Sequence, residues 1–248
     1  MRQFGLIGDK LGHSFSKGYF SEKFQGEGIA ARYDLFELAS IDEFPDLVRR
    51  IQPTGLNVTL PYKEAVIPFL DDLSPAAKTI GAVNTIHFQD GKSTGHNTDI
   101  YGFRISLEES SGGRQFEKAL ILGTGGAAKA VQYVLATDCG IEEILFASRQ
   151  PQEVSQLAYQ ELDADFFNEC FLIVNTTPLG MAPQTDAAPD IPYQFLTDQH
   201  LAFDLIYNPA ETQFMKLAGQ QAAQTINGLQ MLHLQAEKAW DIWNSDAS

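Results

Sequence analysis

The sequence predicts an α/β fold, and two observations carry that prediction. Apolar runs of strand length alternate with helix-length segments along most of the chain. One pair of such runs, separated by a glycine-rich turn and a helix-length interval, has the order of a βαβ unit. At 248 residues the chain is long enough for one large domain or two modest ones.

The βαβ unit begins in Leu120–Val131, where an apolar run passes through glycines into small helix-forming residues, and its second strand is Glu143–Ala147. Gly123, Gly125 and Ala128 have the spacing of a dinucleotide site. In such a site the first glycine allows a sharp turn, the second lets backbone approach a pyrophosphate, and the third position must be small for packing. The N-terminus of the following helix attracts phosphate. The alternative is a glycine turn that only packs helix on strand.

The residues after the second strand bear on the choice of cofactor. An acidic residue there would suit the ribose of NAD, whereas this chain has Ser148 and Arg149. An arginine suits the 2′-phosphate of NADP, so we predict NADP. NAD remains possible, because Glu153 is close in sequence and would oppose a phosphate if it faced the same way. A surface arginine without a ligand is the other interpretation.

Composition limits the partners. The net charge of −15 and the pI near 4.6 argue against nucleic acid or an anionic membrane as a partner. Cys139 and Cys170 have neither metal-ligand spacing nor a disulfide framework, so we expect reduced, buried thiols. No stretch resembles a signal peptide or a membrane span, and we expect a cytoplasmic protein.

Hydrophobic patterns place the other elements. The predicted strands are Phe4–Ile7, Tyr33–Leu38, Leu56–Leu60, Ile80–Phe88 and two apolar runs that start at Phe171 and Leu201 and end in polar, proline-containing loops. The predicted helices are Tyr19–Phe24, Phe44–Ile51, Pro61–Leu70, one that follows Asn97–Asp99, Ala210–Ala223 and Leu229–Trp243. Ser110–Arg114 is a candidate linker between two halves.

Two polar patterns suggest chemistry. Ser14 and Ser16 are two residues apart, so an extended loop would place both hydroxyls on one side, where they could bind a polyol or a carboxylate. Equally, they could cap a helix that starts near Lys17. Lys63 falls in the first turn of the helix after Pro61, where a cation opposes the helix dipole. Lys63 could serve in acid/base catalysis or simply face solvent, and Asp99 could pair with it if their elements meet.

Together these segments resemble the shikimate dehydrogenase family. The resemblance rests on segments that occur in the family's order and span almost the whole chain: Gly12–Ser16, Asn57–Lys63, Gly81–Thr85, Asn97–Gly102, Gly123–Ala127, Asn175–Met181, Asp204–Tyr207 and Gly228–Gln235. Each segment alone is modest, but the ordered set is highly specific. The resemblance implies two α/β domains. Residues 1–100, with 228–248 returning to them, would bind substrate, and residues 101–227 would form a Rossmann-type NADP-binding domain.

The resemblance also implies roles for individual residues. Lys63 and Asp99 match the catalytic pair. Ser14 and Ser16, helped by Tyr207, match the residues that bind the substrate carboxylate. The positions that match holders of substrate are Asn57, Thr59, Lys63, Asn84, Asp99 and Gln235. The positions that match cofactor contacts are Gly123, Thr124, Gly125, Gly126, Ala127, Ser148, Arg149, Thr176, Leu205 and Gly228. No metal is implied.

The activity implied by the resemblance is the reversible, NADPH-dependent reduction of 3-dehydroshikimate to shikimate, on the pathway to chorismate and aromatic amino acids. NADPH would supply a hydride. Lys63 would donate the proton to the carbonyl oxygen or stabilise the developing alkoxide, and Asp99 would orient substrate and lysine. The alternatives are a quinate/shikimate dehydrogenase that uses NAD or both cofactors, and a catalytically silent nucleotide-binding regulator. We expect a monomer or homodimer.

The sequence departs from the family pattern in two places. After Ser16 the family usually has a proline and then a His-Asn pair, where this chain has Lys17, Tyr19 and Phe20. After the second strand of the βαβ unit the family commonly has Asn-Arg-Thr with a further basic residue. Arg149 is therefore the one cation expected at the 2′-phosphate.

Overall fold

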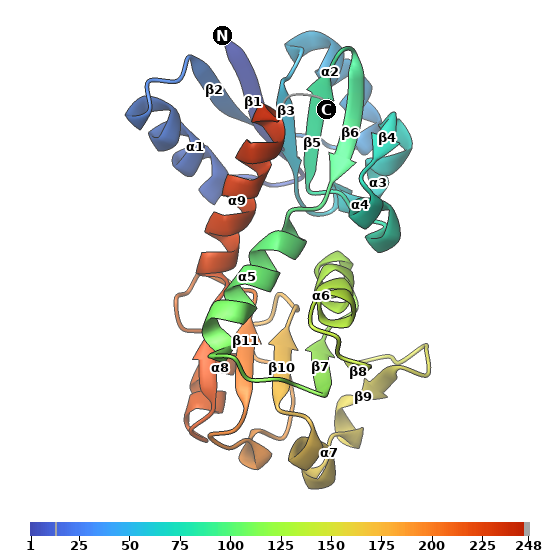
Figure 1. The fold of residues 1–248 in the computed structure, drawn as a ribbon, viewed down its shortest axis with the longest axis vertical. Coiled ribbons are helices and arrows are strands. Elements are labelled where there is room, and N and C mark those ends of the chain that lie inside the picture. The colour runs from blue at the N-terminus through green and yellow to red at the C-terminus, as the bar shows by residue number, and fades with distance from the viewer. Residues whose placement is uncertain (13, 246–248) are drawn as a thin grey trace. The chain divides into compact units, whose positions relative to one another are not determined.

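A computed structural model describes residues 1–12 and 14–245, and His13 of the first family segment lies outside the described residues. Contacts divide the chain into two units (Figure 1). The first unit comprises residues 1–98 and the chain from Ala236 onward, and the second comprises Asp99–Gln235. The assignment of one unit to substrate and the other to cofactor, with the predicted boundaries, stays a prediction.

The described residues of the first unit form a six-stranded sheet with the order β2-β1-β3-β5-β6-β4. Its strands are β1 (Arg2–Gly8), β2 (Ala31–Glu37), β3 (Gly55–Val58), β4 (Asp72–Leu73), β5 (Thr85–Gln89) and β6 (Lys92–His96). Strands β1, β2 and β3 are parallel, whereas β5 runs antiparallel to both β3 and β6. The helices are α1 (Phe15–Gly26), α2 (Phe44–Ile51), α3 (Tyr62–Ala65), α4 (Pro75–Ile80) and the end of α9 (Leu229–Asn244), with 3-10 turns at Ile41–Glu43 and Ile67–Phe69.

Side-chain alternation along the strands builds two cores in the first unit. Phe4 faces α1 and the end of α9, where it packs with Phe20 and Trp243. Ile7, on the opposite face of the same strand, packs with Phe44 of α2 and with residues of α3 and α4. The sheet is therefore covered on both faces, which explains why its inner strand β1 is buried on both sides.

The second unit has a six-stranded, all-parallel sheet in its described residues, with the order β12-β11-β10-β7-β8-β9. Its strands are β7 (Lys118–Leu122), β8 (Glu143–Ser148), β9 (Gln156–Ala158), β10 (Leu172–Asn175), β11 (Leu201–Asp204) and β12 (Gln224–Ile226). Its helices are α5 (Asp99–Ser111), α6 (Gly126–Thr137), α7 (Ala164–Glu169), α8 (Gln213–Gly219) and the start of α9, with 3-10 turns at Tyr159–Glu161 and Tyr193–Phe195. This strand order is that of the doubly wound dinucleotide-binding fold, so the predicted α/β architecture is confirmed.

Helices cover both faces of the second sheet as well. Ile121 of β7 and Phe203 of β11 face α5 and α6, with Met231 of α9 in the same cluster. Leu120 and Ile173, on the other face, pack against α7 and α8. Each strand thus supplies alternate side chains to two cores, the arrangement expected of a parallel sheet between helices.

Several predicted elements differ in extent from the observed ones. The predicted strand Ile80–Phe88 is wrong in its first half, because Ser74 caps α4 and Gly81 ends that helix with a φ of 71°. The predicted helix after Pro61 is one turn, α3, followed by a 3-10 turn, and Ala210–Ala223 contains only the seven residues of α8. The candidate linker Ser110–Arg114 lies inside the second unit. The short elements β4, β9, β12 and α7 were too short for the sequence pattern to show.

The described residues lack a candidate membrane span, a metal-ligand cluster and a disulfide bond. None of their helices is long and apolar enough to cross a membrane. They contain no group of three or more His, Cys, Asp or Glu that could hold a metal ion. Cys139 and Cys170 are free thiols, and burial raises the pKa of the Cys170 thiol to about 12.

The end of α9 is held in the first unit by Trp243. This side chain is 2% exposed, and its indole N–H donates to the carbonyl of Ile86 at 3.0 Å. Gly55 of β3 lies directly beneath the indole, and a Cβ atom added there would overlap the ring. By contrast, a Cβ added at Gly18, the fourth residue of α1, meets nothing within 4 Å. The two glycines are therefore a matched pair for a stability test.

We predict that Gly55→Ala lowers the free energy of unfolding of the first unit by about 1–3 kcal/mol, because the new methyl group forces the indole to shift. Gly18→Ala is expected to raise it by about 0.5–1 kcal/mol, because alanine favours helix more than glycine does. Urea unfolding followed by tryptophan fluorescence measures this unit selectively, since both tryptophans, Trp240 and Trp243, belong to it. Equal effects of the two substitutions would contradict the packing described.

Candidate active site

In the first unit, the predicted substrate-binding residues gather at one edge of the sheet. Strands β1 and β3 end at this edge, and β5 begins there because it runs antiparallel to β3. Ser14 and Ser16 follow β1, Thr59 follows β3, and Asn84 immediately precedes β5. Backbone hydrogen bonds connect these loops, including Thr59 N–H to the carbonyl of Ile7 at 3.0 Å. Residues far apart in sequence thus share one polar edge.

Two buried asparagines organise this edge. Asn57 donates from its side-chain amide to the carbonyl of Asn84 at 3.3 Å and to the hydroxyl of Thr85 at 3.2 Å. The side-chain oxygen of Asn84 accepts from the N–H of Thr98 at 2.7 Å and from the hydroxyls of Thr85 and Thr98 at 3.1 and 3.2 Å. Both side chains therefore have fixed orientations, which a residue that recognises ring hydroxyls requires.

Tyr33, a residue that the sequence did not single out, completes the network. Its hydroxyl donates to the side-chain oxygen of Asn57 at 2.8 Å, and the tyrosine is 3% exposed. Burial raises the pKa of Tyr33, and a hydrogen bond with the Ser16 side chain partly offsets that effect. Phe20, one of the departures from the family pattern, stacks on the Tyr33 ring with 4.7 Å between centroids. Phe20 therefore belongs to the packing beneath this edge.

Ser14 caps a helix, as the capping alternative expected. Helix α1 begins at Phe15, and the Ser14 hydroxyl accepts the backbone N–H of Ser16 at 3.2 Å. The expectation of an extended loop with both hydroxyls on one side is wrong, because Ser16 already belongs to the helix. Both serines remain half-buried at the start of α1. Their binding of a substrate carboxylate stays a prediction.

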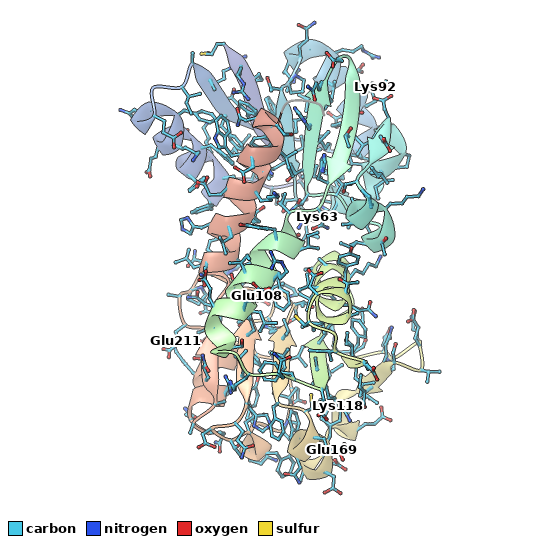
Figure 2. The ribbon with its side chains drawn as sticks, viewed as in Figure 1. Lys63, Lys92, Glu108, Lys118, Glu169 and Glu211 are labelled. Carbon is cyan, nitrogen blue, oxygen red and sulfur yellow. The ribbon has the colours of Figure 1, made fainter. Side chains whose placement is uncertain are left out.

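Lys63 lies half-buried in the single turn α3, directly after β3, where Figure 2 labels it. Its carbonyl accepts the N–H of Val83 at 2.8 Å, which ties this turn to the segment that leads into Asn84. The neighbouring Tyr62 is buried, and its hydroxyl donates to the carbonyl of Leu38 at 2.7 Å. A four-residue helix has a small dipole, so the helix-dipole argument for Lys63 carries little weight. Its position at the polar edge supports the catalytic prediction instead.

In the second unit, the predicted cofactor residues all follow the carboxyl ends of parallel strands. The segment Gly123–Ala127 follows β7, Ser148 ends β8, Thr176 follows β10, and Leu205 and Gly228 follow β11 and β12. In this sheet the chain runs outward from β7 to β9 on one side and outward from β10 to β12 on the other, so the strand order reverses between the neighbouring strands β7 and β10. Ligands of open α/β sheets bind in the crevice outside such a reversal.

The glycine-rich turn after β7 has the geometry that a phosphate needs. Gly123 has a φ of 102°, a backbone conformation that favours glycine. A Cβ added at Gly125, the residue that precedes α6, meets nothing within 4 Å, and no side chain caps this helix. Ala128 is fully buried against the sheet, as the third small position of the motif requires. Open space in front of an uncapped helix N-terminus fits a pyrophosphate group.

The loop after β8 holds the predicted determinant of NADP. Arg149 is exposed, and the turn that carries it is closed by a hydrogen bond from the N–H of Gln150 to the Ser148 hydroxyl at 3.2 Å. Although burial raises the pKa of Tyr159, the charge of Arg149 acts in the opposite direction, so the two side chains are close enough to interact. Glu153 is exposed in the same loop.

Close backbone packing fixes the remaining cofactor positions. The Thr176 hydroxyl donates to the carbonyl of Leu122 at 2.7 Å, which holds the loop after β10 against the end of β7. Leu205 N–H donates to the carbonyl of Asn175 at 3.0 Å. Gly228 lies against the carbonyl of Leu205, where a Cβ atom would overlap the backbone. These three contacts place the loops after β7, β10, β11 and β12 side by side.

Three predicted site residues belong to the second unit although the resemblance assigned them to substrate. Asp99 is buried at the first position of α5, and Gln235 lies on α9. The two helices pack closely at Gly102, where an added Cβ would lie 3.3 Å from the Cβ of Gln235. Tyr207 is half-buried after β11, and burial raises its pKa. The pairing of Asp99 with Lys63 stays a prediction.

Sequence reasoning also assigned no role to a buried polar group behind the cofactor edge. Asn175, Asp204 and Thr212 are fully buried, and Asp204 is hydrogen-bonded to the other two. Asn175 and Asp204 stand at the ends of predicted strands and within family segments, and this position is the signal by which the sequence could have pointed to them. A cavity of about 370 Å³ also lies in this unit, but residues before β7 and β8 line it, at the opposite edge of the sheet.

Comparisons with known proteins agree with this geometry. A family model described as the shikimate dehydrogenase substrate binding domain matches residues 6–86. The chain is 38% identical over 255 residues to a protein named shikimate dehydrogenase (NADP(+)) from Clostridium perfringens, covering 98% of this chain and 93% of the relative.

Two solved structures are also similar. One is shikimate 5-dehydrogenase from Thermus thermophilus in complex with NADP(H) and shikimate, with a TM-score of 0.86 and 31% identity, covering 98% of this chain and 94% of that one. The other is quinate dehydrogenase from Corynebacterium glutamicum in complex with NAD, with a TM-score of 0.87 and 28% identity, covering 98% of this chain and 93% of that one. With near full-length identity above 30% to its relatives and a polar edge in each unit where the family segments fall, this chain belongs to the shikimate dehydrogenase family.

Proposed function

We propose that this chain is an NADP-dependent shikimate dehydrogenase, which reduces 3-dehydroshikimate to shikimate reversibly and so serves the synthesis of chorismate and aromatic amino acids. The observation that carries the proposal is the likeness, over 98% of the chain, to an enzyme solved with both NADP(H) and shikimate. The two polar edges support it, because each gathers residue types that suit one of these ligands. We further propose a cytoplasmic location and a monomer or homodimer.

The second unit suits the cofactor. The turn at Gly123 and Gly125 leaves room for a pyrophosphate in front of α6, and Arg149 supplies a cation at the end of β8. Thr176 and Leu205 stand on the loops after β10 and β11, on the other side of β7 from Arg149, where a nicotinamide-bearing ribose would pass. When bound, NADPH supplies the hydride that a carbonyl carbon needs for reduction.

The polar edge of the first unit suits a polyhydroxylated carboxylate, and the resemblance adds Tyr207 and Gln235 of the second unit. In this proposal Ser14 and Ser16 bind the carboxylate through hydroxyl groups, with Tyr207 as a further donor. Asn57, Thr59, Asn84 and Gln235 hold the ring hydroxyls. This anchoring at a distance from the reacting carbon fixes the orientation of the ring and lowers the entropic part of the barrier.

Lys63 carries the proton chemistry. Reduction of a ketone requires a proton on oxygen as negative charge develops there. The Lys63 ammonium group, on a side chain held at the polar edge by the turn α3, donates that proton or stabilises the alkoxide. Asp99, buried at the start of α5, orients the lysine and a substrate hydroxyl.

A quinate/shikimate dehydrogenase is the second candidate, favoured by one observation. Arg149 stands alone as the cation in its turn, and the similar quinate dehydrogenase was solved with NAD. Reduced-nicotinamide absorbance separates the candidates when purified protein is given shikimate or quinate, each with NADP or NAD. Signal with shikimate and NADP supports the main proposal. Signal with quinate or with NAD alone favours the second candidate. No signal in any combination, from folded protein, favours the silent regulator.

We predict that Lys63→Ala lowers kcat for shikimate oxidation by about 10²–10⁴-fold, the usual contribution of a general acid or base. Binding of NADPH, measured by its own fluorescence, should stay within about twofold, because Lys63 is assigned to the reacting oxygen. Lys92→Ala is the matched control, since Lys92 is an exposed lysine of the same unit at the β5–β6 turn (Figure 2). Turnover of Lys63→Ala at the rate of Lys92→Ala would remove Lys63 from the mechanism.

We predict that Arg149→Ala raises KM for NADP by about 10–100-fold, the usual effect of losing a hydrogen bond to a charged group. KM for NAD should change little, because NAD lacks the 2′-phosphate. Arg50→Ala, which removes an exposed arginine of the first unit, controls for the change in net charge. Initial rates at varied cofactor concentration give both constants. An equal rise in KM for NADP and NAD would contradict a 2′-phosphate role for Arg149.

A further inference from the structure

Asp204 is a buried carboxylate at the end of β11 that the mechanism does not use. It is fully buried, yet the groups that bond it are neutral: the amide of Asn175, the hydroxyl of Thr212 and the backbone N–H of Ile206. Burial raises the pKa of Asp204, and these three hydrogen bonds act against that rise. Burying a carboxylate costs free energy unless its oxygens are hydrogen-bonded, so all three donors matter to the fold.

One carboxylate oxygen reaches the loop after β10. Asp204 Oδ1 accepts from the Asn175 amide at 3.1 Å, and the two residues are direct partners in the β10–β11 ladder. The side-chain oxygen of Asn175, thus oriented, accepts the N–H and the hydroxyl of Thr177 at 3.0 and 2.7 Å. Thr176 lies between these two residues, so its position against Gly123 depends on the chain of bonds that starts at Asp204.

The same carboxylate closes the loop after β11. Oδ1 also accepts the N–H of Ile206 at 3.0 Å, and Oδ2 accepts the Thr212 hydroxyl at 2.6 Å. Thr212 is at the same time the N-cap of α8, since its hydroxyl accepts the N–H of Met215 at 3.3 Å. Leu205 therefore lies between Asp204 itself and Ile206, whose N–H is bound by the Asp204 carboxylate, and the Leu205 carbonyl lies against Gly228.

We propose that Asp204 is a positioning residue for the cofactor: it ties the loops after β10 and β11 together, so that Thr176 and Leu205 are in place before the dinucleotide binds. This inference rests on the proposed function, because it concerns the same cofactor edge. Asp204 is not a catalytic residue, since it acts through Asn175, Ile206 and Thr212. A carboxylate suits the role because both its oxygens accept, whereas an amide would direct an NH₂ group at one of the three donors.

The test uses Thr212→Val, which keeps the side-chain shape but removes the hydroxyl that bonds Asp204. We expect about a tenfold rise in both KM for NADP and the Kd for NADPH, as for a lost hydrogen bond to a charged group. At saturating cofactor, kcat should stay within about threefold of the wild type, because the reacting groups are untouched. Thr212→Ser, which keeps the hydroxyl, should restore cofactor binding.

Asp163→Ala is the matched control for stability. Asp163 caps α7 in the same unit by accepting the N–H of Phe166 at 2.9 Å, but it belongs to neither of the two loops. Its loss should lower the free energy of unfolding without raising the Kd for NADPH. If Thr212→Val loses stability as Asp163→Ala does and still binds NADPH like the wild type, the proposal is wrong.

Two further measurements, on Asp204→Asn and on the wild type, decide the question if Thr212→Val does not fold. Asp204→Asn, which preserves volume, should show the same cofactor defect as Thr212→Val. Wild-type affinity in Asp204→Asn would overturn the proposal even if Thr212→Val failed to fold. The wild type is titrated first with NADPH and assayed with shikimate. If the wild type binds no cofactor, the proposed function itself fails. If the wild type binds NADPH and the variants bind it equally well, only the proposal for Asp204 fails.

Discussion

Buried polar groups at the ends of strands must find hydrogen-bond partners, and this constraint shapes both units. In the first unit the Asn57 amide donates to the carbonyl of Asn84, and the Asn84 side chain accepts the N–H of Thr98, so the two asparagines tie β3 and the segment after β6 to the start of β5. In the second unit Asn175 and Asp204 do the same for the loops after β10 and β11. The irregular segments that carry predicted ligand contacts are therefore fixed to the sheets by buried hydrogen bonds, which water does not reach.

The parts of the fold that could be predicted are those whose signals are local. Helix Phe44–Ile51 was predicted with the bounds observed for α2, because charged and apolar residues alternate there with helical period. The turn at Gly123 was predicted because its glycines follow an apolar run directly. The start of the predicted strand Ile80–Phe88 failed, although Ser74, Pro75 and Gly81 are the cap, first residue and C-cap of a helix. An apolar run of four or five residues suits strand and helix alike, and the caps decide between them.

Local patterns offered Arg149 and Lys63 as candidates, and the resemblance added the other site residues. Neither supplied the side chains that hold these residues in place. Tyr33 bonds Asn57 across 24 positions of sequence, and Asn175 bonds Asp204 across 29. Such contacts depend on which strands are neighbours, and no local pattern encodes that order. Supporting residues are therefore visible in the structure first, even when the residues they support are recognisable in the sequence.

The net charge gives these supporting networks a functional meaning. The chain carries 32 acidic and 17 basic residues, yet the ligands proposed for it are anions. A cluster of cations would be one solution, but each polar edge is built mainly from hydroxyls, amides and backbone N–H groups, with Lys63 and Arg149 as the proposed cations. Neutral donors attract an anion at short range and only when they point at it. The orientation of these donors must therefore be fixed before the ligand binds. Asp204 is itself an acidic residue behind the cofactor edge, but its three hydrogen bonds hold the neighbouring loops in that orientation.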